Sequence, residues 1–165
     1  MHIEYRDDAR LVVDSAIELY KRSTLGERRP IDRPGIFAGM LNNASLTVTA
    51  WDGESLVGIA RCLTDFTYVA YLADLAVDRE YQRRGIGKRL IQETRDRLGQ
   101  ECMIVLLAAP LANEYYPGLG FTHNPRAWVL RGGGVTPAAT GSESISSDLQ
   151  AGAGQPAKLT HREAK

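Results

Sequence analysis

Apolar residues recur three or four positions apart in three segments of the chain, which is the spacing of an amphipathic helix. These segments are residues 11–20, 34–41 and 86–98. Asp7-Asp8 offers an N-cap for the first, Asp32 and Pro34 mark the start of the second, and Gly99 ends the third. The pattern therefore predicts three helices, with a further short helix at residues 112–116.

Between these segments the pattern is typical of strands. Residues expected to form strands are 2–6, 46–51, 56–63, 68–77, 103–109, 121–122 and 127–130. Asp52-Gly53 is a hairpin signal between the second and third of them. The continuous apolar run 103–109 predicts a central strand that is buried on both faces. Strands with interspersed helices indicate an α/β or α+β arrangement in a single domain, residues 1–131.

A change of character follows residue 131. Residues 132–165 begin with three glycines and are rich in small and polar residues, with no periodic apolar face. Such a segment buries too little apolar surface to offset the entropy of ordering it, so we expect a disordered tail.

Composition narrows the function classes only a little. The chain has 165 residues, with 20 basic and 20 acidic side chains, and this balance gives no support to non-specific nucleic-acid binding. No apolar run is long enough to predict a membrane span, and the N-terminus lacks a signal-peptide layout. Cys62 and Cys102 lie in apolar runs and are interpreted as buried thiols, so a cytoplasmic location is the default expectation. The three histidines have no metal-ligand spacing, and no metal is expected.

The segment with the clearest chemistry is a glycine-containing turn between a strand and a helix. Its sequence is Gln82-Arg83-Arg84-Gly85-Ile86-Gly87-Lys88. Backbone amides at Gly85 and Gly87, the dipole of the helix that follows and three basic side chains suit a pyrophosphate. An ordinary strand-to-helix turn with exposed arginines is the structural alternative.

Two other phosphate motifs do not match. A P-loop needs Ser or Thr where Arg89 stands and a glycine where Gln82 stands, and a dinucleotide fingerprint needs a third glycine in place of Leu90. What remains, Gln-x-x-Gly-x-Gly, resembles the coenzyme A pyrophosphate signature of enzymes of the GNAT superfamily.

Three blocks in order resemble this superfamily of N-acetyltransferases over residues 1–131. They are Asp74-Leu75-Ala76-Val77 with the glycine turn, the run Met103–Ala109, and Ala112-Asn113-Glu114-Tyr115-Tyr116-Pro117-Gly118-Leu119-Gly120-Phe121. The chain departs from the family at Ala109, where many relatives carry a coenzyme-contacting asparagine; Asn113 lies nearby but out of register.

The resemblance implies a mixed, mostly antiparallel sheet that splays open between its fourth and fifth strands and is flanked by helices. Acetyl-CoA would bind in the opening, along the backbone of Leu75, Ala76 and Val77, and a neutral amine would attack its thioester directly. The implied coenzyme-binding residues are Leu75, Ala76, Val77, Gln82, Arg83, Arg84, Gly85, Ile86, Gly87, Lys88 and Asn113.

Two side chains are candidates for catalysis. Tyr116 matches the family's general acid, which protonates the leaving thiolate, and its alternative is an aromatic packing residue. Asp74 matches an aspartate that holds or deprotonates the acceptor amine in some relatives, and its alternative is a partly buried structural aspartate.

The acceptor is not identified by these patterns. The loop Glu27-Arg28-Arg29 either shapes the acceptor pocket, as the resemblance implies, or is a solvated charge run, and Asp65, Phe66 and Tyr68 are further pocket candidates. We expect an acetyltransferase for a small-molecule primary amine, with no nucleic-acid or membrane partner and with a homodimer as an option. A lysine or N-terminal protein acetyltransferase and a non-catalytic acyl-CoA sensor are the alternatives.

Overall fold

The alternating segments assemble into one five-stranded sheet in the computed structural model, which describes residues 2–8 and 11–130. Its strands are β1 (Ile3–Arg6), β2 (Leu46–Asp52), β3 (Ser55–Thr64), β4 (Val69–Val77) and β5 (Met103–Val105), in that spatial order. Pairing is antiparallel from β1 to β4 and parallel between β4 and β5. The mixed, mostly antiparallel sheet expected from the sequence is confirmed.

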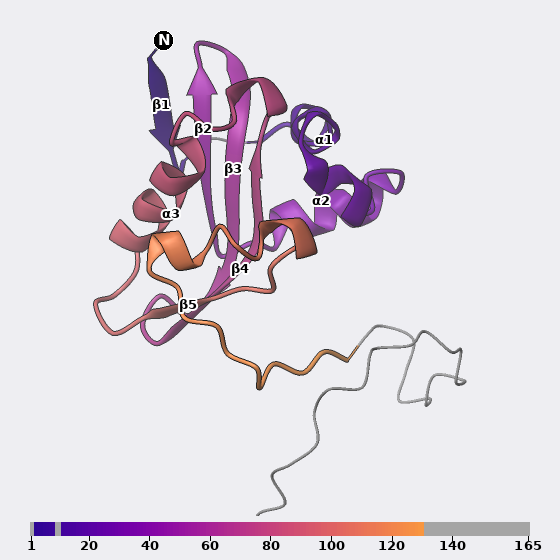
Figure 1. Cartoon of the computed structure of the whole chain (residues 1–165). Helices are drawn as coiled ribbons and strands as arrows, with labels where there is room; N and C mark the ends of the chain where they lie inside the picture. The colour runs from indigo at the N-terminus through magenta and orange to yellow at the C-terminus, as the bar shows by residue number, and fades with distance from the viewer. Residues whose placement is uncertain (1, 9–10, 131–165) are drawn as a thin grey trace, which may run out of the picture. The chain divides into compact units, whose positions relative to one another are not determined.

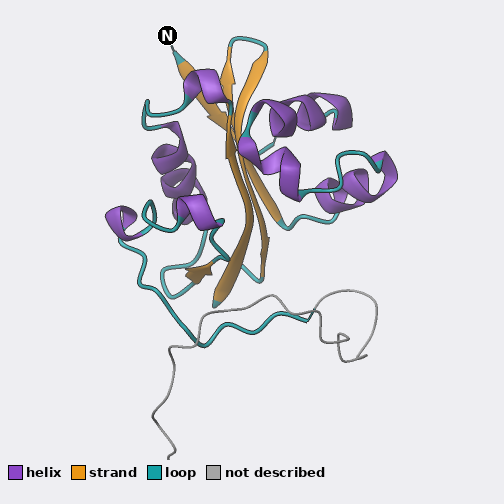
Figure 2. Ribbon diagram, turned by 45° about the vertical axis from the view of Figure 1, so that its right-hand side comes forward, coloured by secondary structure: helices purple, strands orange, loops and turns teal. Residues whose placement is uncertain are grey.

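Helices cover both faces of this sheet (Figures 1 and 2). The helices α1 (Val13–Arg22) and α2 (Pro34–Asn42) pack on one face, and α3 (Ile86–Asp96) packs on the other. Each helix turns its apolar stripe to the sheet, as Leu19 of α1 and Leu90 of α3 show, because both are fully buried. Two hydrophobic cores result, one on each side of the sheet.

The first helix begins later than predicted. Its N-cap is Val12, which provides no side-chain hydrogen bond, whereas Asp7 accepts a hydrogen bond from Arg97. Asp7, which was expected to cap the helix, therefore forms an ion pair with Arg97 instead. The 3₁₀ helix η1 (Thr24–Arg28) follows α1, in a segment predicted to be a loop.

Strands β4 and β5 form a fork. They pair only through Val69, Ala70 and Tyr71 on β4, so the ladder ends where β5 ends at Val105. Residues 106–109, predicted to continue the strand, have no strand structure. The edge of β4 from Leu72 onward consequently has no strand beside it, and this is the predicted splay.

On its other edge β4 carries a bulge. Arg61 of β3 pairs with Asp74, but the next residue, Cys62, pairs with Leu72, which leaves Ala73 extra. As a result Leu72 faces the core under α3, whereas Asp74 faces α1 on the opposite side.

The last part of the described chain differs most from the prediction. The helix expected at residues 112–116 is replaced by two 3₁₀ helices, η3 (Pro110–Ala112) and η4 (Pro117–Leu119), because a proline begins each short turn. Residues 121–130 contain no strand, so the two late strands predicted there are not formed.

The first compact unit is Met1–His123, and of the second, Asn124–Lys165, only residues 124–130 are described. The predicted boundary at residue 131 and the predicted disorder of residues 132–165 lie at or beyond the end of the described residues. No helix within the described ranges combines the length and the apolar character that spanning a membrane requires.

Candidate active site

The glycine turn has the backbone conformation of an anion-binding loop. Gly85 is the N-cap of α3 with φ of 82°, and Arg83 before it has φ of 59°, so both lie in the left-handed region. Nothing stands within 4 Å of the position a Gly85 Cβ would occupy, so conformation rather than crowding favours glycine there. The first N–H groups of α3 have no partner inside the helix and point out of its open end.

At Gly87 crowding rather than backbone conformation favours glycine. A Cβ on this residue would stand 2.8 Å from the hydroxyl oxygen of Tyr115. The Tyr115 ring thus reaches from the segment after β5 to the first turn of α3, and it contacts the ring of Tyr116 edge to face at a centroid distance of 5.5 Å. Glycine at this position lets the two segments meet.

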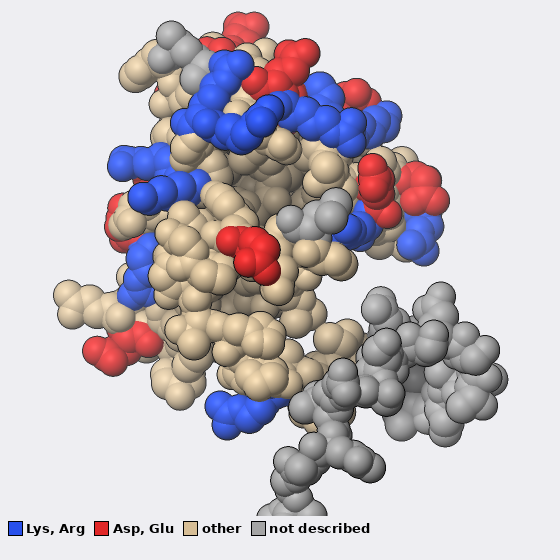
Figure 3. All heavy atoms as spheres, in the orientation of Figure 1, with Lys and Arg blue, Asp and Glu red and all other residues tan. Residues whose placement is uncertain are grey.

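The other residues of the turn divide into exposed and structural ones. Arg83, Arg84 and Lys88 are exposed, and the Arg84 guanidinium lies over the Tyr81 ring at 5.4 Å. Gln82 donates a hydrogen bond to the Val77 carbonyl at 3.0 Å, so its amide closes the end of β4. Ile86, by contrast, is buried in the core. Figure 3 shows a band of basic side chains across the upper part of this face, beside a hollow lined by uncharged residues.

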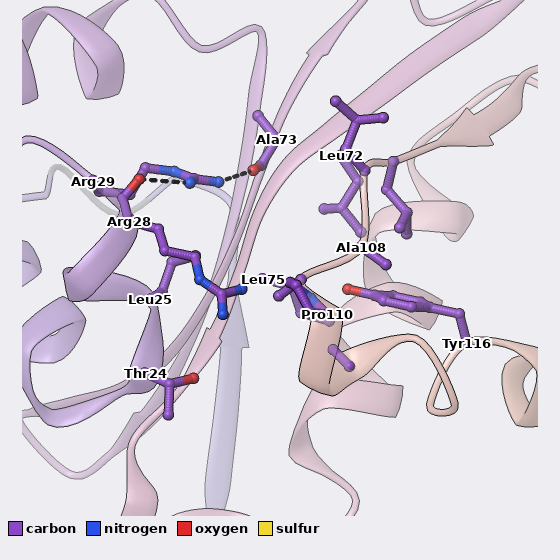
Figure 4. A pocket seen from close by; sticks show the side chains of 14 residues that line it. Thr24, Leu25, Arg28, Arg29, Leu72, Ala73, Leu75, Ala108, Pro110 and Tyr116 are labelled. Atoms are coloured by element: carbon purple, nitrogen blue, oxygen red, sulfur yellow. Dashed lines mark hydrogen bonds between the residues drawn. The ribbon is translucent and has the colours of Figure 1, made fainter. Parts of the chain in front are cut away.

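A cavity of about 260 Å³ lies at the fork between β4 and the chain after β5 (Figure 4). Three parts of the chain line it: η1 and the residue after it, the edge of β4, and the segment from Leu106 to Tyr116. The lining residues are Thr24, Leu25, Arg28, Arg29, Leu72, Ala73, Leu75, Leu106, Leu107, Ala108, Ala109, Pro110, Ala112 and Tyr116. The bulge residue Ala73 and the end of the β4–β5 ladder are therefore what opens the cavity.

Tyr116 points its hydroxyl into this cavity, toward Leu75 (Figure 4). Its ring packs against Phe121 at a centroid distance of 5.5 Å, which fixes its direction. No hydrogen bond joins its hydroxyl to any residue within the described ranges. Burial, and after it the neighbouring Tyr115, raise the pKa of Tyr116 above its usual value, so the phenol keeps its proton at neutral pH.

Asp74 lies behind the cavity wall rather than on it. Its side chain has 0% exposure, and its carboxylate accepts hydrogen bonds from Arg29 at 2.5 Å, from Tyr20 at 2.9 Å and from Arg61. Burial, followed by the charge of Asp74 and the hydrogen bond to it, raises the pKa of Tyr20. The contacts that the structure shows for Asp74 are thus with Arg29, Tyr20 and Arg61, while its predicted contact with an acceptor amine stays a prediction.

The loop after α1 divides in the structure. Arg28 and Arg29 line the cavity, whereas Glu27 forms an ion pair with Arg79 at 3.7 Å. The sequence left two interpretations of this loop open, a solvated charge run and a wall of the acceptor pocket. Arg28 and Arg29 lie where the second interpretation places them, on the wall of the cavity.

The remaining sequence candidates are spread around the fork. Leu75 lines the cavity, Ala76 is buried toward α1, and Asn113 is exposed and does not line the cavity. Asp65 accepts three backbone hydrogen bonds in the β3–β4 turn, so its role there is local. Within the described ranges, no three His, Cys, Asp or Glu side chains are placed to hold a metal ion.

Sequence reasoning missed part of the cavity wall. Thr24, Leu25 and Leu72 carry no chemical motif, and the residues 106–109 were assigned to a strand. One signal was available: Leu72 and Leu75 are three positions apart, which does not fit a regularly alternating strand and indicates the bulge.

Comparison with known proteins agrees with this geometry. Residues 13–121, more than half of the chain, match the model of the acetyltransferase (GNAT) family. An uncharacterized ycf52-like N-acetyltransferase from Prochlorococcus marinus is 31% identical over 116 residues, which cover 67% of this chain and 63% of that protein. Several other curated relatives are longer, and the chain covers only about a third of their length.

Solved structures share the fold. A probable acetyltransferase from meticillin-resistant Staphylococcus aureus superimposes with a TM-score of 0.65 at 21% identity, covering 79% of this chain and 98% of that one. The structure of AAC(6′)-Iy in complex with the bisubstrate analog CoA-S-monomethyl-acetylneamine superimposes with a TM-score of 0.62 at 18% identity. The match covers 79% of this chain and 98% of that one. With its fork, its glycine turn and the family match over residues 13–121, this chain belongs to the GNAT acetyltransferase family.

Proposed function

We propose that this chain transfers the acetyl group of acetyl-CoA to the primary amine of a small-molecule acceptor. The observation that carries the proposal is the cavity at the β4–β5 fork, into which Tyr116 directs its hydroxyl between an open strand edge and the η1 loop. Enzymes of this family use acetyl-CoA as co-substrate, and the described residues fit it.

The fit rests on two features of the fork. Beyond Tyr71 no described strand pairs with this edge of β4, so an extended pantetheine arm can lie along it and hydrogen-bond the backbone there. The glycine turn stands at the end of the same strand, where its backbone amides and exposed basic side chains suit the pyrophosphate.

In the proposed reaction the neutral amine nitrogen attacks the acetyl carbonyl carbon, a C–N bond forms and the C–S bond breaks. Tyr116 gives its proton to the departing sulfur, and the amine nitrogen loses a proton to water. A backbone N–H on the open edge of β4 stabilises the developing oxyanion. The raised pKa of Tyr116 suits a general acid, because the phenol stays protonated until it is needed.

A small acceptor is supported by the size and walls of the cavity. About 260 Å³ accommodates a small molecule, and the η1 loop and the segment after β5 enclose it from two sides. A lysine side chain of a protein would need an open approach past these two segments.

The test is a screen that follows release of the coenzyme A thiol from acetyl-CoA. The panel contains small primary amines, lysine-containing peptides and peptides with free N-termini, and acetyl-CoA binding is measured separately by calorimetry. Turnover of small amines is the expected result. Turnover of peptides alone would replace the proposal with protein acetylation, and tight acetyl-CoA binding without any turnover would indicate a sensor.

A further inference from the structure

The walls of the cavity carry positive charge without an acidic side chain. Arg28 and Arg29 are the charged residues among those that line it, and neither aspartate nor glutamate is among them. Arg28 is exposed and Arg29 is half-buried, so an acceptor with a second ammonium group would be repelled by positive charge that solvent screens only in part. The acceptor therefore has to suit two arginines.

Arg29 is already held by the protein. It donates to the Asp74 carboxylate at 2.5 Å, to the Ala73 carbonyl at 2.7 Å and to the Arg28 carbonyl at 2.9 Å. The first of these bonds pairs its charge with a carboxylate that Arg61 shares, and the last ties down the backbone of Arg28. Arg29 is consequently a positioning residue that fixes the η1 loop against the bulge of β4.

Arg28 is different, because its guanidinium extends from the loop into the cavity toward Leu75 (Figure 4). No carboxylate within the described ranges pairs with it, and its acidic neighbour Glu27 pairs with Arg79 instead. The Tyr116 hydroxyl enters the same space from the opposite wall (Figure 4). The cavity thus has an arginine for binding at one side and a proton donor at the other.

From this arrangement we infer that the acceptor is an amine that also carries an anionic group, a carboxylate or a phosphate, and that Arg28 binds this group. The inference rests on the proposed function. A planar guanidinium with several N–H donors binds such oxyanions through two parallel hydrogen bonds. Held there, the anionic end would leave the amine free to reach the thioester beside Tyr116.

The phosphates of acetyl-CoA are a second source of the same anionic chemistry. The glycine turn, with Arg83, Arg84 and Lys88, already provides basic groups for them at the far end of β4. The experiment must therefore measure acceptor and coenzyme separately.

Matched probes differ only in the anionic group. Glycine and its homologues up to 6-aminohexanoate are each compared with the carboxamide and the plain alkylamine, and phosphoethanolamine is compared with ethanolamine. Three proteins are tested: wild type, Arg28→Glu, and the control Arg33→Glu, which makes the same charge change on the same connection outside the cavity lining. Calorimetry gives the acetyl-CoA affinity of each.

We expect kcat/KM for the best anionic amine to exceed that of its carboxamide by about 10- to 100-fold, the range for a hydrogen-bonded charge pair. Arg28→Glu should abolish this preference. Arg33→Glu should keep the preference of the wild type, and all three proteins should bind acetyl-CoA with the same affinity. A fall in acetyl-CoA affinity in Arg28→Glu, with the acceptor preference kept, would assign Arg28 to the coenzyme and overturn the inference.

The remaining outcomes separate the inference from the proposed function. Turnover without preference for the anionic member of each set overturns the inference and leaves the acetyltransferase proposal standing. If no amine is turned over, the proposed function fails, and the same probes are titrated into protein saturated with coenzyme A. Carboxylate binding that disappears in Arg28→Glu then supports the anion site, and equal binding of acid and amide refutes it.

Discussion

The buried cluster around Asp74 should dominate the response of this fold to a single substitution. In Asp74→Asn the side chain keeps its shape but loses its charge, and one carboxylate oxygen becomes an NH₂ group that faces the donors of Arg29, Arg61 and Tyr20. The arginines would lose their counter-ion and the amide would bring two hydrogens against other donors. The substitution therefore tests how strongly the cluster holds β4 to α1 and the η1 loop.

The size of the effect follows from the exposure of the partners. The Arg61 side chain is 7% exposed, so removing its partner leaves a buried charge unpaired, at a cost of about 3–5 kcal/mol. The Arg29 side chain is 26% exposed, and solvent screening limits its share to about 1 kcal/mol or less. We expect a loss of unfolding free energy near 4 kcal/mol, or a fall in Tm of roughly 10–20 °C.

Thermal and urea unfolding of wild type and Asp74→Asn give this difference. Asp78→Asn is a matched control. Asp78 is also buried and also contacts α1, but its partner there is Arg22, whose side chain is 46% exposed. Asp78→Asn should lose clearly less unfolding free energy than Asp74→Asn. An Asp74→Asn protein within 1 kcal/mol of wild type would refute the argument and return Asp74 to the role of a group that acts on the acceptor.

Three further outcomes are expected. Tyr116→Phe should lower kcat by about 10²–10⁴-fold with acetyl-CoA affinity unchanged, if the hydroxyl is the general acid and chemistry limits the rate; Tyr115→Phe is the control, and equal kcat in wild type and Tyr116→Phe would remove the residue from the mechanism. Gly85→Val should weaken acetyl-CoA binding and lower stability by about 1–3 kcal/mol, because valine is strained at φ of 82°; calorimetry and urea unfolding measure both effects, and a neutral substitution would contradict the conformation of the turn. Burial raises the pKa of the Cys62 thiol to about 12, so the unfolded chain loses this proton at a lower pH than the folded protein does. The free energy of unfolding should therefore be constant below pH 8 and fall as the pH rises toward 12, by about 1.4 kcal/mol per pH unit above pH 9. Between pH 7 and pH 10 the wild type should lose more unfolding free energy than Cys62→Ala, and equal losses would contradict the raised pKa.

What the sequence predicted well depended on local periodicity. The apolar stripe of α3 and the Asp52-Gly53 hairpin are features of neighbouring residues, and the structure has both. The glycine turn was also recognisable, because left-handed backbone at Gly85 is a local requirement that glycine meets. These elements were predictable without knowing which strands pair.

The site itself depends on contacts that no local pattern records. Arg29 and Asp74 are 45 positions apart, and Arg61 reaches the same carboxylate from a neighbouring strand. The length of β5 was overestimated for a similar reason, because an apolar run does not reveal where its parallel partner turns away. The cavity opens at the end of that pairing, so its walls were only partly predictable.

The extra residue in β4 has a consequence for how this chain can vary. Deleting Ala73 would restore a regular strand, in which residues two apart face the same side. Leu72 and Asp74 would then be adjacent in the chain and would still face opposite sides, but the strand would lose the bend of the bulge at which the Ala73 carbonyl accepts from Arg29. An insertion or deletion at this point is therefore not a neutral length change, because the bulge and the Arg29 anchor depend on the residue count of β4.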